Sequence, residues 1–180
     1  MKSRRAWFNL ILLISVGLGI GGCNSPGKKG SESKLGKKEA TSLRFFLEVN
    51  PDGTQRNAPV PIYRAQPIYI NVEKAPILNE ADILKTELVN ADIEGGFAIK
   101  VQFTAHGSLI FENASTTYRG HRIAIQAIWT EARWLGAPRM SRRVTDGQFI
   151  FTPDATREEA ERIVHGVNNV SKELQKPFVF

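Results

Sequence analysis

The side chains that could carry out chemistry are scattered along this sequence. His106, His121 and His165 stand far apart, and none has a second histidine or a cysteine at the spacing of a metal site. Ser108 and Ser115 lack the Gly-x-Ser-x-Gly setting that places a nucleophilic serine on a strained turn. We therefore expect no catalytic residue, no metal ion and no cofactor, and we predict that the protein is not an enzyme.

The only cysteine in the sequence, Cys23, differs from these side chains because it directly follows a segment typical of an export signal. A basic start at residues 2–5 precedes an apolar run over 6–20. That run is shorter than the ~20 residues that a membrane-spanning helix needs. The residues Ile20-Gly21-Gly22-Cys23 then resemble the bacterial lipobox, in which small residues admit a peptidase and the cysteine thiol accepts diacylglycerol.

We accordingly expect residues 1–22 to be a lipoprotein signal peptide that is cleaved between Gly22 and Cys23. The lipid on Cys23 would then hold the protein at a membrane, since several acyl chains make a stable anchor where one does not. Asn24, in place of Asp, resembles Gram-negative lipoproteins of the outer membrane, which favours a periplasm-facing location there. Two alternatives remain: an uncleaved short anchor, and an ordinary signal peptide that leaves Cys23 inert.

Residues 23–41 predict a flexible linker, because they are rich in Gly, Ser and Lys and contain almost nothing apolar. The net charge of +6 comes from this linker and the signal peptide, since basic and acidic residues are equal in number from Ser42 onward. A domain without surplus basic residues lacks the electrostatic footprint of a phosphate-binding protein. We therefore expect one folded domain over 42–180 and no nucleic-acid partner.

The segment after Trp129 suggests a surface for a protein partner. It combines aromatic, aliphatic and arginine side chains, and aromatics and arginines dominate binding hot spots. The candidate partner-binding residues are Trp134, Leu135, Arg139, Met140, Arg142 and Arg143. A structural alternative is that Trp129 belongs to the core and that the arginines solvate a sheet edge and discourage its pairing.

Alternation of apolar and polar residues predicts most of the strands that must position these side chains. The expected strands span 42–50, 68–72, 83–92, 97–103, 121–129 and 148–152, and residues 83–92 also fit a helix. Residues 54–67 contain three prolines and are expected to form an extended connector. We expect a loop over 130–136 and an extended segment over 137–144.

Two helices complete the pattern. The first is expected over 106–118, and its apolar face comprises Leu109, Ile110, Phe111, Ala114 and Tyr118. The second begins at a capping box, Thr156 to Glu159, and its apolar stripe comprises Ala160, Ile163, Val164 and Val167. This order predicts an α+β fold, ferredoxin-like in layout, with a mostly antiparallel sheet and both helices packed on one face.

Three motifs occur in order between Ile77 and Asn169. The first is the strand FAIKVQFT over 97–104, followed by Gly107 and Phe111. The second is GHRIAI over 120–125, followed by an Ala-Pro pair. The third is DGQFIF over 146–151, followed by ATREEA. Together they resemble the head subdomain of the first periplasmic domain of SecD and SecDF, membrane subunits that assist protein export.

The resemblance implies a SecD-head-like fold and a non-catalytic binding domain, whose partners would be unfolded exported polypeptides or proteins of the translocase and envelope. SecD continues into membrane helices, whereas no apolar run after residue 22 of this sequence is long enough to span a bilayer. We therefore expect this protein to correspond to the substrate-facing module of SecD without its membrane-spanning part. Two other functions stay open: a structural envelope lipoprotein with no export role, and a hydrolase with an unrecognised site.

Overall fold

Strands and helices alternate along the part of the chain that the computed structural model describes, residues 39–91 and 96–176. The strands are β1 (Ser42–Leu47), β2 (Asn57–Ile62), β3 (Ile68–Glu73), β4 (Ile83–Asn90), β5 (Phe97–Phe103), β6 (Ile123–Ile128), β7 (Ala132–Gly136) and β8 (Gln148–Phe151). The helices are η1 (Glu80–Asp82), α1 (Ala105–Thr117) and α2 (Arg157–Leu174). The predicted signal peptide, Cys23 and most of the linker lie outside the described residues. None of the described helices combines the length and hydropathy needed to cross a bilayer.

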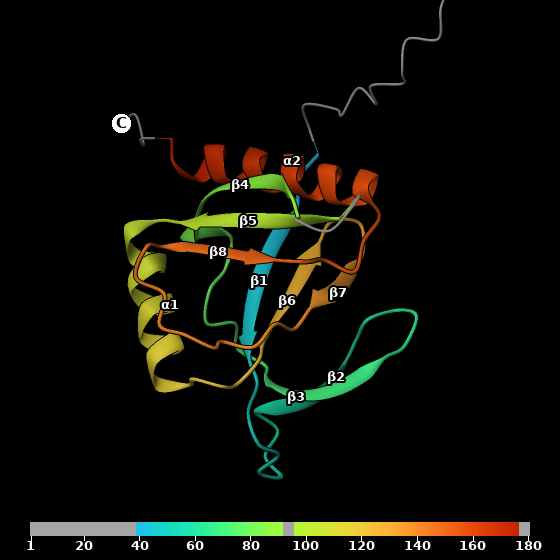
Figure 1. The fold of residues 1–180 in the computed structure, drawn as a ribbon, viewed down its shortest axis with the longest axis vertical. Helices are drawn as coiled ribbons and strands as arrows, with labels where there is room; N and C mark the ends of the chain where they lie inside the picture. Colours follow the sequence, from blue (N-terminus) through green and yellow to red (C-terminus); the bar gives the residue numbers. More distant parts are fainter. Residues whose placement is uncertain (1–38, 92–95, 177–180) are drawn as a thin grey trace, which may run out of the picture. The chain divides into compact units, whose positions relative to one another are not determined.

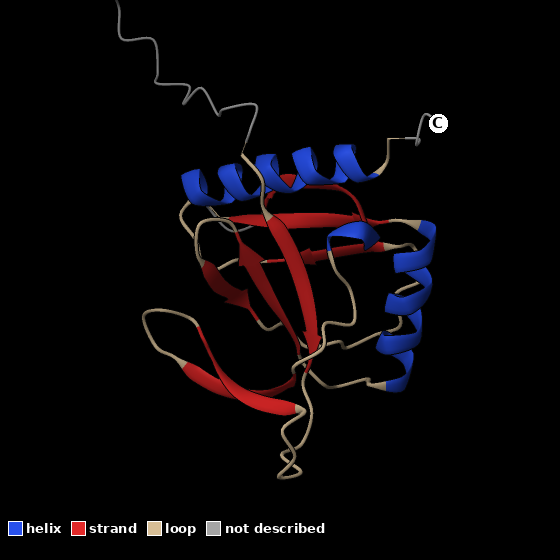
Figure 2. Ribbon diagram, turned by 180° about the vertical axis from the view of Figure 1, so that it is seen from behind, coloured by secondary structure: helices blue, strands red, loops and turns tan. Residues whose placement is uncertain are grey.

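The strands form three small antiparallel sheets instead of the single sheet expected. Their orders are β1-β6-β7, β2-β3 and β4-β5-β8. The strands of β4-β5-β8 run across those of β1-β6-β7, and α1 and α2 lie against this arrangement (Figure 1; Figure 2 gives the opposite view). The α+β class, with antiparallel pairing and two long helices, is confirmed for the described residues.

An aromatic cluster fills the space between the two three-stranded sheets. Phe45 comes from β1, Phe103 from β5, Phe111 from α1 and Phe149 from β8. Ring centroids lie 5.4 Å apart for Phe45 and Phe103, 5.1 Å for Phe103 and Phe111, and 4.9 Å for Phe111 and Phe149. Because these four rings come from distant parts of the sequence, the cluster joins both sheets and α1 into one core.

Helix α1 buries only part of the face that the apolar pattern predicts. Leu109 is 70% exposed and Tyr118, at the C-cap, is 40% exposed, whereas Phe111 and Ala114 are buried. The reason is Gly107, which lies so close to η1 that a Cβ there would stand 2.6 Å from the carbonyl oxygen of Asp82. This close approach of two backbones turns the helix so that Gly107, rather than Leu109, faces the domain.

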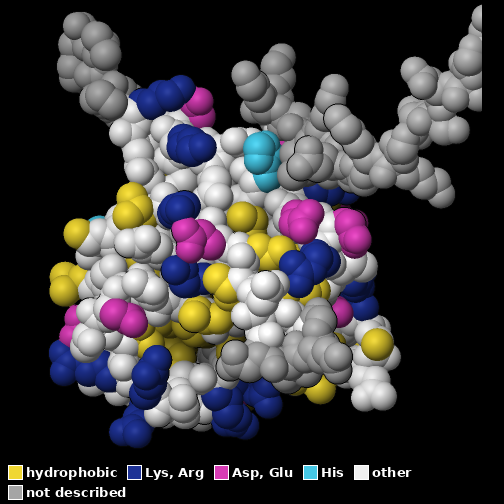
Figure 3. Space-filling model, turned by 45° about the horizontal axis from the view of Figure 1, so that its top comes forward, with side chains coloured by type: hydrophobic (Ala, Val, Ile, Leu, Met, Phe, Trp, Pro, Cys, Tyr) yellow, Lys and Arg dark blue, Asp and Glu magenta, His cyan; other side chains and the backbone are white. Residues whose placement is uncertain are grey.

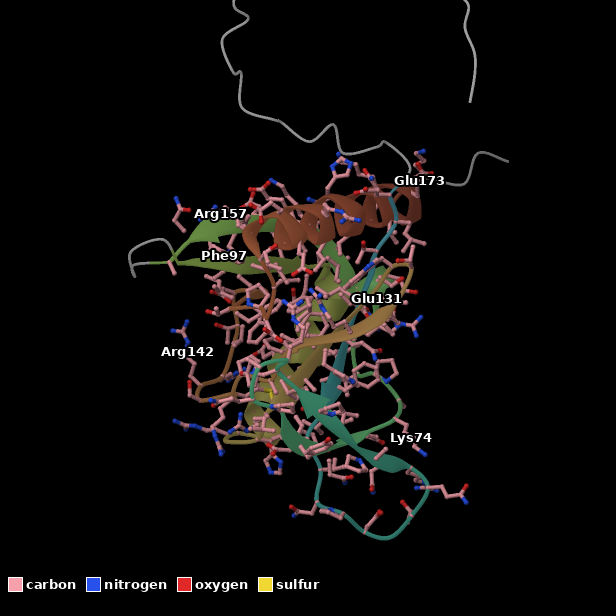
Figure 4. All side chains as sticks on the ribbon, turned by 90° about the vertical axis from the view of Figure 1, so that its right-hand side faces the viewer. Lys74, Phe97, Glu131, Arg142, Arg157 and Glu173 are labelled. Carbon is pink, nitrogen blue, oxygen red and sulfur yellow. The ribbon has the colours of Figure 1, made fainter. Side chains whose placement is uncertain are left out.

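Helix α2 follows the sequence prediction closely. The capping box is present, since Thr156 accepts a hydrogen bond from the Glu159 backbone and the Glu159 carboxylate accepts one from the Thr156 backbone. Ala160, Ile163 and Val167 are buried as expected. At its first turn, the Arg157 guanidinium lies over the ring of Phe97 from β5, 5.3 Å from the ring centroid, which is within the reach of a cation–π contact (Figure 4).

Side chains of α2 also hydrogen-bond to the outer edge of β4, where the sheet has no further strand among the described residues. The Asn168 carboxamide accepts a hydrogen bond from Thr86 N over 2.8 Å and donates one to Thr86 O over 2.9 Å, as an adjacent strand would. Ser171 and Gln175 donate to the carbonyl groups of the first two residues of β4. Polar residues on α2 therefore close a sheet edge that would otherwise have unpaired backbone groups.

Asn168→Ala is expected to lower the free energy of unfolding by about 2–3 kcal/mol, because it leaves the N–H and C=O of the buried Thr86 unpaired. Urea denaturation followed by tryptophan fluorescence measures the change. Lys172→Ala, on the exposed side of the same helix, is the matched control and should stay within about 0.5 kcal/mol of the parent. Equal effects of the two substitutions would contradict this role of Asn168.

Strand β2 lies where the prolines predicted a connector. Pro59 and Pro61 both fall inside β2, which pairs with β3 throughout its length. They alternate with residues 58, 60 and 62, so their missing N–H groups belong to the outer edge of the strand and do not interrupt its pairing with β3. The hairpin packs Ile62, Ile70 and Val72 against the outer face of β1-β6-β7, where they form a second, smaller core.

Strand β7 lies where a loop was predicted, and this prediction is wrong. Its residues Ala132–Gly136 pair with β6 after a tight turn in which Trp129 N donates to Glu131 O. A charged residue, Arg133, occupies an inward position of the strand, which hides the apolar alternation. The segment over 137–144, expected to be extended, forms a single bridge between Arg122 and Arg139 and no strand.

Candidate interaction surface

The six candidate partner-binding residues divide between the interior and the surface. Leu135 and Met140 are buried in the main core. Trp134 is half-buried, and its ring packs edge-on against Phe46 at a centroid distance of 5.1 Å. These three side chains are held by packing: β7 directs Leu135 into the main core and Trp134 against the smaller one, and the loop after β7 buries Met140. Arg139, Arg142 and Arg143 are the exposed members of the set.

The three exposed arginines lie on the loop between β7 and β8 and differ in their partners. Arg139 donates to Gly120 O over 2.9 Å, and Arg143 forms an ion pair with Glu112 of α1. Arg142 has no hydrogen bond or ion pair with another described residue, and it extends away from the ribbon (Figure 4). Of these three charges, that of Arg142 is therefore the one most free to meet a partner.

A groove of about 240 Å³ separates this loop from β8. Its floor is apolar, with Phe111, Met140 and Phe149, and its rim carries Arg142 on one side and Ile150 on the other. The Ile150 side chain is 56% exposed. The space-filling view of this side of the domain shows hydrophobic side chains gathered centrally, with Lys and Arg along the lower margin (Figure 3).

The backbone of β8 is paired on one edge only. Phe103 N donates to Gly147 O over 2.9 Å, and by the register of the two strands the next hydrogen-bonded pairs are Val101 with Phe149 and Ile99 with Phe151. The N–H and C=O groups of Gln148 and Ile150 consequently point away from β5. Gln148 N is bonded by the Asp146 carboxylate, but no described residue outside the sheet bonds to Ile150.

The residues with catalytic potential are not brought together. His106 lies at the start of α1 with its Nδ1 2.9 Å from Asp82 Oδ1, and His121 Nδ1 lies 3.1 Å from the backbone oxygen of Glu48. Ser115 is buried, and its Oγ accepts a hydrogen bond from Val144 N. This bond joins the loop between β7 and β8 to α1. Within 39–91 and 96–176, no group of three His, Cys, Asp or Glu side chains could hold a metal ion.

Sequence reasoning missed a charge pair that joins β7 to α2. Arg133 is 15% exposed, stacks on Trp129 at 5.1 Å and donates from Nη1 to Glu159 Oε1 over 2.9 Å. That hydrogen bond, followed by the one from the Thr156 backbone, lowers the pKa of Glu159 to about 2. Arg133 could have been singled out only by its odd position in an otherwise apolar alternation.

Comparison with known proteins gives a structural relationship only. No family model matches this sequence, and no curated protein matches it either. One solved structure, of SecDF described as a membrane component that enhances protein export, superposes with a TM-score of 0.52 over 73% of this chain at 19% identity. The crystal structure of SecDF in its super-membrane-facing form gives a TM-score of 0.52 over 73% of this chain at 20% identity. The domain has a SecDF-like fold.

The SecDF-like fold confirms the resemblance that the three sequence motifs indicated. This chain spans 63% of the first SecDF chain and 19% of the second, so it corresponds to a part of those proteins. The motifs themselves have structural roles here. Gly107 allows the contact with Asp82, Phe111 fills the core, and Gly147 adopts a φ of 64° at the turn into β8.

Proposed function

We propose that this protein is a membrane-anchored, non-catalytic binding module that contacts unfolded polypeptides during export. The observation that supports the proposal most is the SecDF-like fold, because SecDF is described as a membrane component that enhances protein export. The groove beside β8 adds a surface suited to such contact, with an apolar floor for side chains and a free cation at its rim. Lipid on Cys23 would keep this surface close to the membrane.

Photocrosslinking in intact cells tests the binding role. A photoreactive phenylalanine analogue replaces Ile150, whose exposed side chain lines the groove, in the full chain, and newly synthesised proteins are pulse-labelled. We expect crosslinks to labelled proteins in transit that disappear during the chase as export is completed. The same analogue at Glu158, which is exposed on α2, is the control. Equal labelling from both positions, or none from either, would argue for a structural envelope protein with no export role.

The proposed lipid anchor on Cys23 is tested separately. Mass spectrometry of the mature protein from isolated membranes should find Cys23 at the N-terminus and acylated, and Cys23→Ser should leave the signal peptide uncleaved. A mature chain with a free thiol at Cys23 would remove the membrane anchor from the proposal while leaving the binding role to be decided by the crosslinks.

A further inference from the structure

We propose that β8 is a docking edge at which an extended, acidic segment of a polypeptide adds as a further strand of the β4-β5-β8 sheet. The proposal rests on the proposed function and specifies how an unfolded chain is held. Main-chain hydrogen bonds to β8 would supply a part of the affinity that does not depend on the bound sequence, and the charges beside β8 would add a preference for acidic segments. Such a mode suits a protein that meets many different chains.

The first argument is that several other sheet edges in the described domain are covered or blocked, at least in part. Asn168 and its neighbours on α2 close the edge of β4. The edge of β1 is bridged at Phe45, whose N–H donates to Leu78 O over 3.0 Å. The outer edge of β2 carries Pro59 and Pro61, which have no N–H, and the end of β7 accepts a hydrogen bond at Leu135 O from Asp154 N.

Natural proteins protect sheet edges in these ways because an open edge pairs with any available strand. Against that background β8 is an exception. The N–H and C=O of Ile150 point outward, β8 itself contains no proline, and no described side chain hydrogen-bonds to the Ile150 backbone. An alternating row of donors and acceptors is complementary to another extended backbone and to few other ligands.

The second argument is the chemistry beside this edge. A strand added to β8 would direct alternate side chains into the groove, onto Phe149 and Met140, and the others outward beside Ile150. Arg142 faces it from across the groove with no partner among the described residues, and Arg139 lies on the same rim. Strand β8 has 4 residues, so it would hold a short segment rich in apolar and acidic residues.

The same charges disfavour a second copy of this chain as the occupant. Antiparallel pairing of β8 with itself would bring together two groove rims that each carry Arg139 and Arg142 against the single carboxylate of Asp146, and the surplus of like charge would oppose it. An acidic strand would instead neutralise this surplus. We therefore take the occupant to be a polypeptide with carboxylate side chains.

The test uses synthetic peptides and the full chain in detergent. A ten-residue peptide of alternating valine and glutamate is the probe, and its affinity is measured by fluorescence anisotropy. Two changes to the peptide serve as comparisons: lysine in place of glutamate, and N-methylation of alternate valines, which removes N–H donors without altering the side chains. We expect each change to weaken binding at least tenfold.

Two variants of the protein test the same edge. Arg142→Glu reverses an unpaired surface charge. We expect it to lower the affinity for the valine–glutamate peptide at least tenfold and to raise the affinity for the lysine peptide. Ile150→Pro removes the outward N–H at a position where an edge strand tolerates proline. Since Ile150→Pro could unfold the domain, its circular dichroism is compared with the parent, and the N-methylated peptide supplies the same information without a protein variant.

The outcomes separate this inference from the proposed function. Binding that is indifferent to N-methylation and to Arg142→Glu would overturn strand addition at β8, even if crosslinks to proteins in export were found. Loss of those crosslinks in cells with peptide binding intact would overturn the export role alone. Concentration-dependent dimerisation of the parent in analytical ultracentrifugation, lost in Ile150→Pro, would assign the edge to a second copy and overturn the proposal.

Discussion

Phe111→Ala is expected to lower the free energy of unfolding by about 3–5 kcal/mol, a large part of the stability of a single domain. The side chain is fully buried and contacts the rings of Phe103 and Phe149, so its removal leaves a cavity between the two sheets and α1. Because Phe111 also forms part of the groove floor, the same change should deepen the groove beside β8.

Urea denaturation, with Trp129 and Trp134 as reporters, measures this loss. Leu109→Ala is the matched control, since it removes a large apolar side chain two residues away that is 70% exposed. We expect Leu109→Ala to stay within about 0.5 kcal/mol of the parent. A larger effect at Leu109 than at Phe111 would contradict the burial of Phe111 and the exposure of Leu109.

Glu159→Ala is expected to lower the free energy of unfolding by about 2–4 kcal/mol at neutral pH. The substitution removes the single hydrogen-bond partner of Arg133, whose Nε and Nη2 are already buried without partners. It also removes half of the capping box of α2 and an ion pair with Arg64. Breaking a fully buried pair costs more than this, but the Glu159 side chain is 32% exposed, so water can compensate in part.

The contribution of Glu159 should depend on pH in a defined direction. Its pKa is lowered to about 2 in the folded domain, first by the hydrogen bond from Arg133, against about 4.3 in an unfolded chain. A lowered pKa means that the stabilisation is complete above the unfolded value and is lost as the pH falls towards 2. The stability difference between the parent and Glu159→Gln should therefore shrink between about pH 5 and pH 2.

Glu158→Ala is the control for this experiment, because Glu158 occupies the same helical turn but is exposed and interacts mainly with the helix dipole. We expect a change of a few tenths of a kcal/mol for it. A stability difference for Glu159→Gln that stayed constant down to pH 2 would show that the carboxylate charge is not what holds Arg133.

The sequence predicted the elements whose signals are local. The alternation of Ile99, Val101 and Phe103 predicted β5 with its bounds and its buried face, and the capping box predicted the start of α2. Both signals work because strand alternation and helix capping depend on neighbouring residues. The SecD-like arrangement could be predicted as well, since its motifs mark positions that the backbone fixes.

The errors arose where distant residues decide the local structure. The prolines of β2 are tolerated because they occupy the outer edge of the hairpin, and Arg133 is tolerated inside β7 because Glu159 meets it from α2. Neither fact is visible in the local sequence. The prediction of the partner-binding surface was wrong at two residues for the same reason. Leu135 and Met140 resembled exposed hot-spot residues, but Leu135 is buried by the pairing of β7 with β6 and Met140 by the fold of the loop after β7.

The hydrogen bonds from α2 to β4 have a consequence for the order in which the domain can form. Thr86 and Asn168 are 82 residues apart, so β4 and β5 are synthesised long before the helix that seals them. Until α2 arrives, the growing chain cannot complete its fold, because contacts over such a distance form late and cost loop-closure entropy. Helix α2 thus delays completion of this domain until nearly all of its strands and helices have been synthesised.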